Sequence, residues 1–180
     1  NGDMHGWRAD GGELAIACGN WVSCWSTVPP QLPPRLIAET ELKAACECDD
    51  IRFVGFSQEG ESIFLGRNSG VDTWDPKSGK KQQRVRFQRN DGWFWQHGLS
   101  PDRSVMLSLS DRGCLMQTDT QSWSSRRFTA VKNSYGSNFV FSPDGKLAAC
   151  RTGYGTVFIW DVVEGRPWLK WSKPHYGSLG

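Results

Sequence analysis

The feature that most constrains this chain is a spacing that occurs four times. An aromatic residue or a leucine ends a strand-like run, and 18 or 19 residues later a Trp, or a residue in its place, stands in another such run. The four pairs are Trp7 with Trp25, Phe56 with Trp74, Leu99 with Gln117, and Phe141 with Trp160. A unit of this size cannot bury its own apolar face, so the spacing predicts a stack of repeated supersecondary units.

The last repeat shows the expected elements most clearly. Ser142-Pro143-Asp144-Gly145 has the composition of a tight turn, because Pro presets φ and Gly tolerates a positive φ. The run after Gly155 is rich in β-branched and aromatic residues, which favours a strand. Pro167 indicates an edge strand, since it has no N–H for a central ladder. The four predicted strands are residues 138–141, 147–150, 156–160 and 166–171.

A Phe-Ser-Pro-Asp-Gly turn followed by a strand ending in Trp-Asp resembles the repeat of WD-repeat β-propellers. The match is good for residues 141–145 with Trp160-Asp161, and nearly as good for residues 56–60 with Trp74-Asp75. Residues 99–103 keep the turn but are followed by Gln117-Thr118 where Trp-Asp would stand, and residues 7–11 with Trp25-Ser26 match least. The steps between positions 25, 74, 117 and 160 are 49, 43 and 43 residues, against roughly 40–45 per blade in that family. The Pro-rich insertion 29–34 accounts for the longer first step.

The resemblance implies an all-β fold, a β-propeller of four-stranded antiparallel blades with about four blades in this chain. We expect the blades at residues 1–46, 47–90, 91–132 and 133–173, with 174–180 as a tail or linker. A content of 20 Gly and 9 Pro in 180 residues suits many short strands and turns. Residues 35–46 have a helix-favouring composition, but the repeat requires an outer strand there, and we expect a strand.

Four blades lie at the low end of the propeller range, so we expect this chain to be part of a larger propeller. Two alternatives remain open, a half-propeller that pairs with a second copy and a closed ring of four blades. The matched blades also depart from the family pattern. No Gly-His pair precedes a repeat, and the second-turn Asp position holds Gly19, Asn68, Asp111 and Tyr154.

Neither catalysis nor metal binding is indicated. His5, His97 and His175 are scattered and lack the sequence context of a nucleophile with its base, and we expect His97 to be a packing residue. Cys46-Glu47-Cys48 does not have a zinc-ligand spacing, and Cys18, Cys24, Cys114 and Cys150 fall at expected core-facing strand positions. We therefore expect no enzyme activity, no cofactor and no metal, with reduced thiols in an intracellular, cytoplasmic setting. No apolar run approaches the roughly 20 residues of a membrane span.

A binding surface is the positive hypothesis. In the propeller fold, the turns between second and third strands share one rim with the residues that precede each first strand. Trp, Tyr and Arg are the residue types that anchor protein interfaces. Trp93 and Trp95, two residues apart on an expected strand, are predicted to face the same side. The candidate rim residues for a protein partner are Asp50, Arg52, Asn68, Trp93, Trp95, Asp111, Tyr135 and Tyr154.

Basic residues gather on the expected outer strands. The net charge is only +2, which argues against a dedicated nucleic-acid domain. The functional interpretation is an acidic partner or RNA, and the structural one is protection of edge strands by charge. The nucleic-acid candidates are Lys80, Lys81, Arg84, Arg86 and Arg89, and the outer strands also carry Arg126, Arg127, Arg166, Lys170 and Lys173.

The sequence thus predicts a non-catalytic WD-repeat-like platform for protein–protein interaction, as one module of a larger scaffold or sensor protein. Two alternatives follow from the same features. The propeller caps or gates an enzyme domain outside this chain, or it binds RNA through its basic outer strands.

Overall fold

The structure, a computed structural model, describes residues 4–18, 21–27, 35–41, 50–129, 139–152 and 156–172. These residues form four antiparallel sheets of four strands each, and every sheet is built from strands that are consecutive in the chain. The predicted all-β fold of four-stranded antiparallel blades is confirmed, and the sheets are called blades 1 to 4 in chain order. The one helix among the described residues is a 3-10 turn, η1 (Arg89–Asp91), between blades 2 and 3.

The strand bounds are as follows. Blade 1 contains β1 (Met4–Trp7), β2 (Glu13–Cys18), β3 (Trp21–Ser26) and β4 (Arg35–Glu41). Blade 2 contains β5 (Ile51–Phe56), β6 (Ile63–Arg67), β7 (Gly70–Asp75) and β8 (Lys80–Arg86). Blade 3 contains β9 (Phe94–Leu99), β10 (Val105–Ser110), β11 (Cys114–Asp119) and β12 (Ser125–Thr129). Blade 4 contains β13 (Val140–Phe141), β14 (Leu147–Arg151), β15 (Thr156–Asp161) and β16 (Arg166–Ser172).

The ambiguous segment after residue 35 is a strand. β4 pairs with β3 along its length, so the repeat overrides a composition that favours a helix. Pairing with β3 gives the seven residues of β4 backbone hydrogen bonds in the ladder. The intrinsic helix propensity of a short isolated segment is too weak to compete with this pairing.

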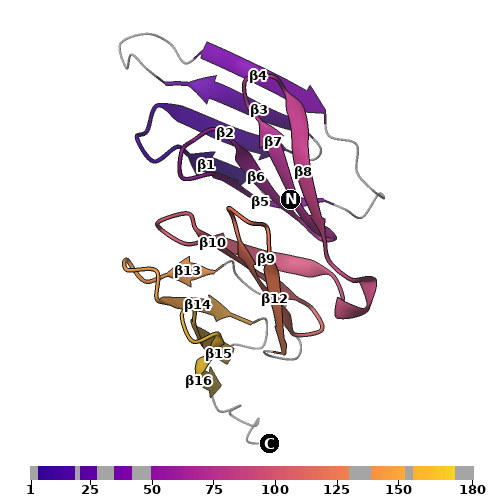
Figure 1. Ribbon diagram of the computed structural model, residues 1–180, viewed down its shortest axis with the longest axis vertical. Coiled ribbons are helices and arrows are strands. Elements are labelled where there is room, and N and C mark those ends of the chain that lie inside the picture. Colours follow the sequence, from indigo (N-terminus) through magenta and orange to yellow (C-terminus); the bar gives the residue numbers. More distant parts are fainter. Residues whose placement is uncertain are drawn as a thin grey trace, which may run out of the picture.

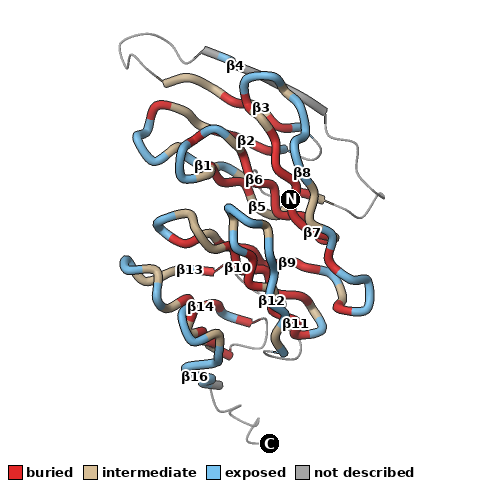
Figure 2. The backbone as a smooth tube through the Cα atoms, viewed as in Figure 1, coloured by how far each residue is buried: buried red, intermediate tan, exposed pale blue. Residues whose placement is uncertain are grey.

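The first strands of the blades lie side by side, and the fourth strands lie at the outside. β1 contacts β5, β5 contacts β9, and β9 contacts β13. Blades 1 and 4 lie at opposite ends of the long axis, so the described blades form an open arc (Figure 1). Figure 2 shows that the outer strands β8, β12 and β16 are largely exposed, whereas the middle strands β6, β7 and β10 are buried.

Close contact between first strands depends on glycine. A Cβ on Gly6 would lie 2.6 Å from the carbonyl oxygen of Val54, and one on Gly98 would lie 2.5 Å from the Cβ of Phe139. Both glycines precede the last residue of their strand. The same position in blade 4 holds Val140, which is 71% exposed and has no described blade beyond it.

The core consists of three apolar clusters, one at each junction between neighbouring blades. Trp74 is fully buried among residues of blades 1 and 2, including Val22 and Ile51. Trp160 is buried between blades 3 and 4. Trp25 occupies the same repeat position in blade 1 but is only half-buried, because no described blade covers that face.

The ladder register corrects one assignment made from spacing. Trp74 pairs with Ile63, which pairs with Phe56, and the equivalent chain in blade 3 runs from Leu99 through Met106 to Thr118. Thr118-Asp119 therefore stands where Trp-Asp stands in blade 2, one residue later than the predicted Gln117-Thr118. A spacing of 18 or 19 residues between repeat positions is too loose to settle the register, because one extra turn residue shifts it.

Gln117 instead belongs to the contact with blade 4. Its Nε2 donates to the carbonyl oxygen of Val162 at 2.9 Å, and its Oε1 accepts from Nε1 of Trp160 at 3.2 Å. Side chains alternate between the two faces of a strand, so Thr118 faces the opposite side. On that side, blade 3 places Trp123 against Phe64 of blade 2, with ring centroids 5.2 Å apart.

The first turn of each blade requires a left-handed residue. Gly11, Gly60 and Gly145 adopt φ near +72° at this position, whereas blade 3 uses Arg103 at φ +64°. The Arg103 guanidinium donates to the carbonyl oxygens of Phe56 at 2.9 Å and Trp7 at 3.2 Å, which end the first strands of blades 2 and 1. The arginine that stands in place of glycine in blade 3 thus makes hydrogen bonds to both blade 1 and blade 2.

Cys24, Cys114 and Cys150 are buried, as expected. Cys18 is exposed at the end of β2, so the prediction of a core-facing or half-buried position is wrong for this residue. The cause is its place at the strand end, where the alternation no longer points toward a neighbouring blade. The described part of the chain contains no helix with the length and hydrophobicity needed to cross a membrane.

Candidate binding site on the turn rim

We call the edge formed by the second turns and the residues before each first strand the turn rim. Six of the eight predicted rim residues lie in the described parts of blades 2 and 3, and they gather at the junction of these two blades. Tyr135 and Tyr154 lie outside the described residues. The six are Asp50, Arg52, Asn68, Trp93, Trp95 and Asp111.

Two of these side chains are carried by β-bulges at matching places. In blade 2, Ile51 pairs with Arg67 and Phe53 with Gly66, which leaves Arg52 as the extra residue. In blade 3, Phe94 and Gln96 pair with consecutive residues of β10, which leaves Trp95 as the extra residue. A bulge re-aims the side chain of the inserted residue, and both bulges lie at the rim end of a first strand.

The two bulged residues meet each other across the blade junction. The guanidinium carbon of Arg52 lies 4.3 Å from the centroid of the Trp95 ring, a cation–π contact. The same guanidinium pairs with Asp50 at 3.0 Å and donates from Nε to the Asn68 side-chain oxygen at 3.1 Å. Four predicted residues therefore form one network that links blades 2 and 3.

Trp93 is held beside this network by its backbone. Its N–H donates to Oδ1 of Asp111 at 2.9 Å, and its carbonyl oxygen accepts from the Asp111 N–H at 2.9 Å. The indole itself is 41% exposed. β9 begins at Phe94, so Trp93 precedes the strand, and Trp95 is the extra residue of the bulge. The regular alternation on which the predicted shared face depends is therefore interrupted between the two tryptophans.

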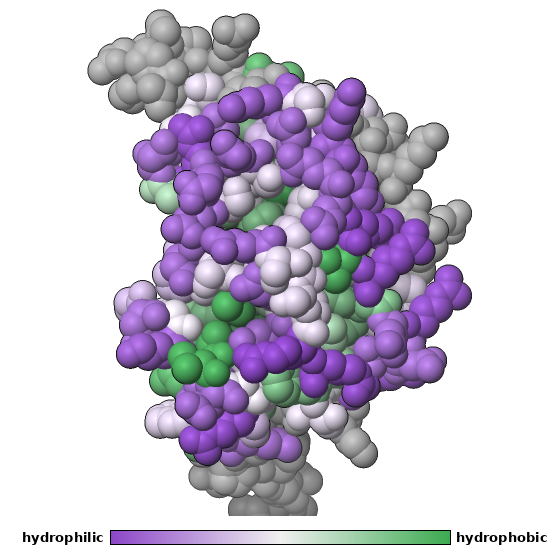
Figure 3. Space-filling model, in the orientation of Figure 1, coloured by the Kyte–Doolittle hydropathy of each residue, from purple (hydrophilic) through white to green (hydrophobic). Residues whose placement is uncertain are grey.

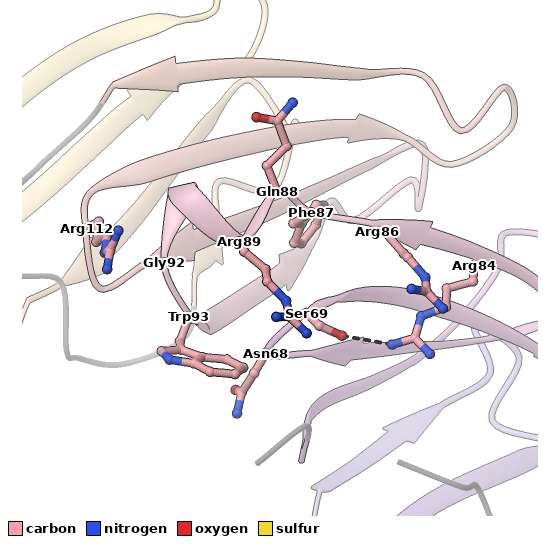
Figure 4. A pocket seen from close by; sticks show the side chains of 10 residues that line it. All are labelled: Asn68, Ser69, Arg84, Arg86, Phe87, Gln88, Arg89, Gly92, Trp93 and Arg112. Atoms are coloured by element: carbon pink, nitrogen blue, oxygen red, sulfur yellow. Dashed lines mark hydrogen bonds between the residues drawn. The ribbon is translucent and has the colours of Figure 1, made fainter. Parts of the chain in front are cut away.

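A cavity of about 510 Å³ opens next to Trp93. Figure 4 shows Arg84 and Arg86 toward one end, Arg112 at the other, and Arg89 and Trp93 between them. The residues that line it are Asn68, Ser69, Arg84, Arg86, Phe87, Gln88, Arg89, Gly92, Trp93 and Arg112.

The sequence had assigned three of these arginines to the outer perimeter and had not singled out Arg112. Arg84 and Arg86 lie on β8, but they stand at its rim end, where β8 leads into the connection to blade 3. The polar, Gly-containing run 88–92 indicates a connecting loop, which is the only local signal for this part of the cavity.

Several basic residues of the outer strands are engaged within the fold. The buried carboxylate of Asp72 pairs with Arg67 at 3.0 Å, Lys81 at 2.7 Å and Arg84 at 3.5 Å. Arg127 pairs with the buried carboxylate of Asp91 at 2.6 Å. The basic side chains that the sequence placed on the outer strands are therefore not all available to a partner, because Lys81, Arg84 and Arg127 are in ion pairs within the fold.

His97 and Cys150 are buried, and desolvation disfavours the charged form of each side chain. His97 is fully buried, its Nδ1 lies 2.9 Å from the hydroxyl of Ser108, and desolvation lowers its pKa to about 4. Burial raises the pKa of the Cys150 thiol to about 12. Among the described residues, no group of His, Cys, Asp and Glu side chains is arranged to hold a metal ion.

The sequence matches no protein-family model. It is 24% identical over 177 residues to Protein LST8 homolog of Drosophila pseudoobscura pseudoobscura, in an alignment that covers 88% of this chain and 53% of the relative. The chain thus spans about half the length of this curated relative, which is a WD-repeat protein. Its four sheets have the strand order and size of WD-repeat blades. Together, the four repeated four-stranded sheets and this similarity are consistent with WD-repeat β-propeller blades.

Proposed function

We propose that this chain is a non-catalytic platform that binds a protein partner through the turn rim at the junction of blades 2 and 3. WD-repeat propellers act in general as protein-interaction scaffolds, and the chain has their fold. We further propose that it works as one module of a larger scaffold or sensor protein, in an intracellular compartment where its buried thiols stay reduced.

The observation that carries the proposal is the exposed indole of Trp93 beside a rigid network. Trp93 is 41% exposed, and its backbone is held by two hydrogen bonds with Asp111: the Trp93 N–H donates to the Asp111 carboxylate, and the Asp111 N–H donates to the Trp93 carbonyl oxygen. Interface energy concentrates in a few Trp, Tyr and Arg side chains set in ordered surroundings. A preorganised anchor loses little conformational entropy when a partner binds.

The neighbouring network supports the same site. The cation–π contact between Arg52 and Trp95 joins the two blades, and the hydrogen bond from Arg52 to Asn68 holds the guanidinium within blade 2. A partner that contacts Trp93 therefore meets a surface whose two halves are held in one arrangement. This is the property that a binding platform requires.

The test compares two exposed tryptophans. Affinity-tagged wild type, Trp93→Ala and Trp168→Ala are produced in the same cells, and the captured proteins are quantified by mass spectrometry. Trp168 is 61% exposed on the outer strand β16 of blade 4, so it controls for the loss of an exposed indole. Circular dichroism melting curves confirm that each variant is folded.

We expect Trp93→Ala to deplete a defined set of captured proteins by about tenfold, the loss that removal of an interface anchor causes. Trp168→Ala should leave that set unchanged. Equal capture by wild type and Trp93→Ala would refute the turn rim as the binding surface. A large loss of stability in Trp93→Ala would show that the indole is a core residue instead.

A further inference from the structure

The cavity next to Trp93 has an unusual charge composition. Four of its ten lining residues are arginine and none is an aspartate, glutamate or lysine. Arginine presents a planar fork of N–H donors that matches a phosphate group in two-point contacts. A concave site lined only by this cation selects for an anion with several oxygen atoms.

The four arginines are not equally engaged by the protein. Arg84 contacts Ser69 at 2.8 Å and Asp72 at 3.5 Å, so part of its charge is matched within blade 2. Arg112 donates one hydrogen bond to the carbonyl oxygen of Asn90 at 3.3 Å, which orients the guanidinium without neutralising it. Among the described residues, no carboxylate pairs with Arg86 or Arg89, and both are exposed.

Part of the positive charge of the outer strands is offset inside the fold. Lys81 shares the one negative charge of the buried Asp72 with Arg67 and Arg84, and Arg127 pairs with the buried Asp91. Arg86, Arg89 and Arg112 have no carboxylate partner among the described residues, and they line the same cavity as the exposed Trp93, with Arg86 at one end, Arg112 at the other and Arg89 between them (Figure 4). A volume of about 510 Å³ falls within the usual range for ligand sites.

We infer that this cavity binds a phosphorylated serine or threonine in a peptide segment of a protein partner. The inference rests on the proposed function and adds the chemistry of recognition. Arg86 and Arg89 contact the phosphate, Arg112 orients a second acidic group of the segment, and Trp93 packs against an adjacent apolar side chain. Clusters of arginine are a recurring solution for phosphopeptide recognition.

The distribution of charge favours a short peptide over a nucleic acid. An RNA strand makes successive phosphate contacts and needs a basic groove that continues beyond one pocket. Here the four arginines line one cavity, and two other cations of the outer strands, Lys81 and Arg127, are engaged by the buried carboxylates of Asp72 and Asp91. A single phosphate with one neighbouring acidic group needs only the local cluster.

The inference is tested by fluorescence anisotropy at physiological ionic strength with residues 1–180. The probes are three pools of short labelled peptides with phosphoserine, glutamate or serine at the centre and mixed flanking residues, together with a short oligouridylate. Two double variants are compared. One carries Arg86→Glu and Arg89→Glu together, and the matched control carries Lys77→Glu and Lys80→Glu together. The control makes the same charge change on exposed residues of blade 2 outside the cavity.

We expect the phosphoserine pool to bind at least about tenfold more tightly than the serine pool, with glutamate between them, since phosphate carries more charge and more acceptors. The arginine pair of substitutions should remove about tenfold of the phosphopeptide affinity, and the lysine pair less than about twofold. Tighter binding of oligouridylate than of the phosphoserine pool would overturn the inference in favour of RNA. Equal losses in both double variants would show only unspecific charge attraction and would also overturn it.

The two proposals fail separately. If Trp93→Ala loses its protein partners while the phosphoserine and serine pools bind alike, the platform stands and the phosphate chemistry is wrong. If partner capture is unaffected by Trp93→Ala but phosphopeptides bind through Arg86 and Arg89, the rim is not the partner surface that we propose.

Discussion

At the residue scale, Trp160 shows how a divergent repeat still holds its neighbour. The indole makes an edge-type contact with Phe128 of blade 3, with ring centroids 4.9 Å apart, and its N–H donates to Gln117 of the same blade. Gln117 also donates to the backbone carbonyl of Val162, so one amide joins blade 3 to the end of β15 through two hydrogen bonds. The residue that spacing had treated as a lost tryptophan is a partner of the tryptophan in the next repeat.

We expect Trp160→Ala to lower the free energy of unfolding by about 3–5 kcal/mol, because it leaves a cavity between two blades. The amide of Gln117 also loses a partner, which adds to the cost. Urea denaturation followed by circular dichroism measures the change. Trp168→Ala, at a 61% exposed position, should stay within about 0.5 kcal/mol of wild type, and equal losses would contradict the assigned packing.

His97 makes a second prediction, for the dependence of stability on pH. Its pKa is lowered from 6.5 to about 4 by desolvation, so the folded state keeps the ring neutral. As pH falls, the unfolded chain takes up a proton first, and stability decreases from about pH 6.5 down to about pH 4. At about 1.4 kcal/mol per pKa unit, the total loss is roughly 3 kcal/mol.

Urea midpoints between pH 7 and pH 4 measure this slope. His97→Gln should flatten it, since the amide does not titrate and retains a group that can bind the Ser108 hydroxyl. His5→Gln removes an exposed histidine and should leave the slope unchanged. A slope that persists in His97→Gln would assign the proton uptake to other groups.

At the scale of the element, the first strands depend on how closely they approach one another. Gly6 and Gly98 lie where the neighbouring first strand leaves no room for a side chain. The glycine before the last strand residue therefore reflects blade packing and not turn geometry. Blade 4 carries Val140 at this position because nothing described lies against it.

We expect Gly98→Ala to destabilise the chain by about 1–3 kcal/mol, the cost of inserting a group into a packed contact. The new Cβ would lie 2.5 Å from that of Phe139, so blades 3 and 4 must separate slightly. Thermal unfolding measures the loss. Val140→Ala at the equivalent position should cost little, and a similar loss in both variants would show that strand propensity decides the effect.

Blade 3 also departs from the other blades at two of its left-handed turn residues. Arg103 and Trp123 take φ values of +64° and +58°, where the equivalent turns of other blades use glycine. Such conformations cost on the order of 1 kcal/mol for a residue with a side chain. Both side chains reach blade 2, through a carbonyl of Phe56 and the ring of Phe64, and these contacts offset the strain.

At the scale of the whole molecule, the two end blades expose large apolar side chains. Trp7, Trp21 and Leu36 are 41–50% exposed in blade 1, and Val140, Trp168 and Trp171 are 51–71% exposed in blade 4. Most of the surface in Figure 3 is hydrophilic, with an apolar patch over the end that holds blade 4. Exposed strand edges with such side chains promote association between chains.

We therefore expect residues 1–180 to self-associate as concentration rises, which size exclusion with light scattering measures directly. A dimer stable to dilution would indicate two half-propellers that complete one ring, and a polydisperse mixture would indicate ends that other blades normally cover. Val140→Lys should weaken the association by placing a charge on the end of blade 4. A monodisperse monomer at every concentration would contradict the prediction.

The features that could be predicted from the residues alone are those that depend on short-range physics. Turn residues such as Pro143 and Gly145 and the alternation along each run predict the strands, and the repeat spacing predicts four stacked sheets. The outer strand at Arg35–Glu41 and the interblade burial of Trp160 follow from the same pattern. Local propensities and a unit that cannot bury its own face are sufficient for these conclusions.

The features that could not be predicted are those that depend on how neighbouring blades pack against each other. A shift of one residue separates Gln117 from Thr118, and only the ladder between β10 and β11 resolves it. The cavity beside Trp93 combines β8, a connecting loop and two turns, and no local pattern relates Arg86 to Arg112. Such features arise from distances between residues that are remote in sequence, which depend on packing rather than on the backbone preferences of any one segment.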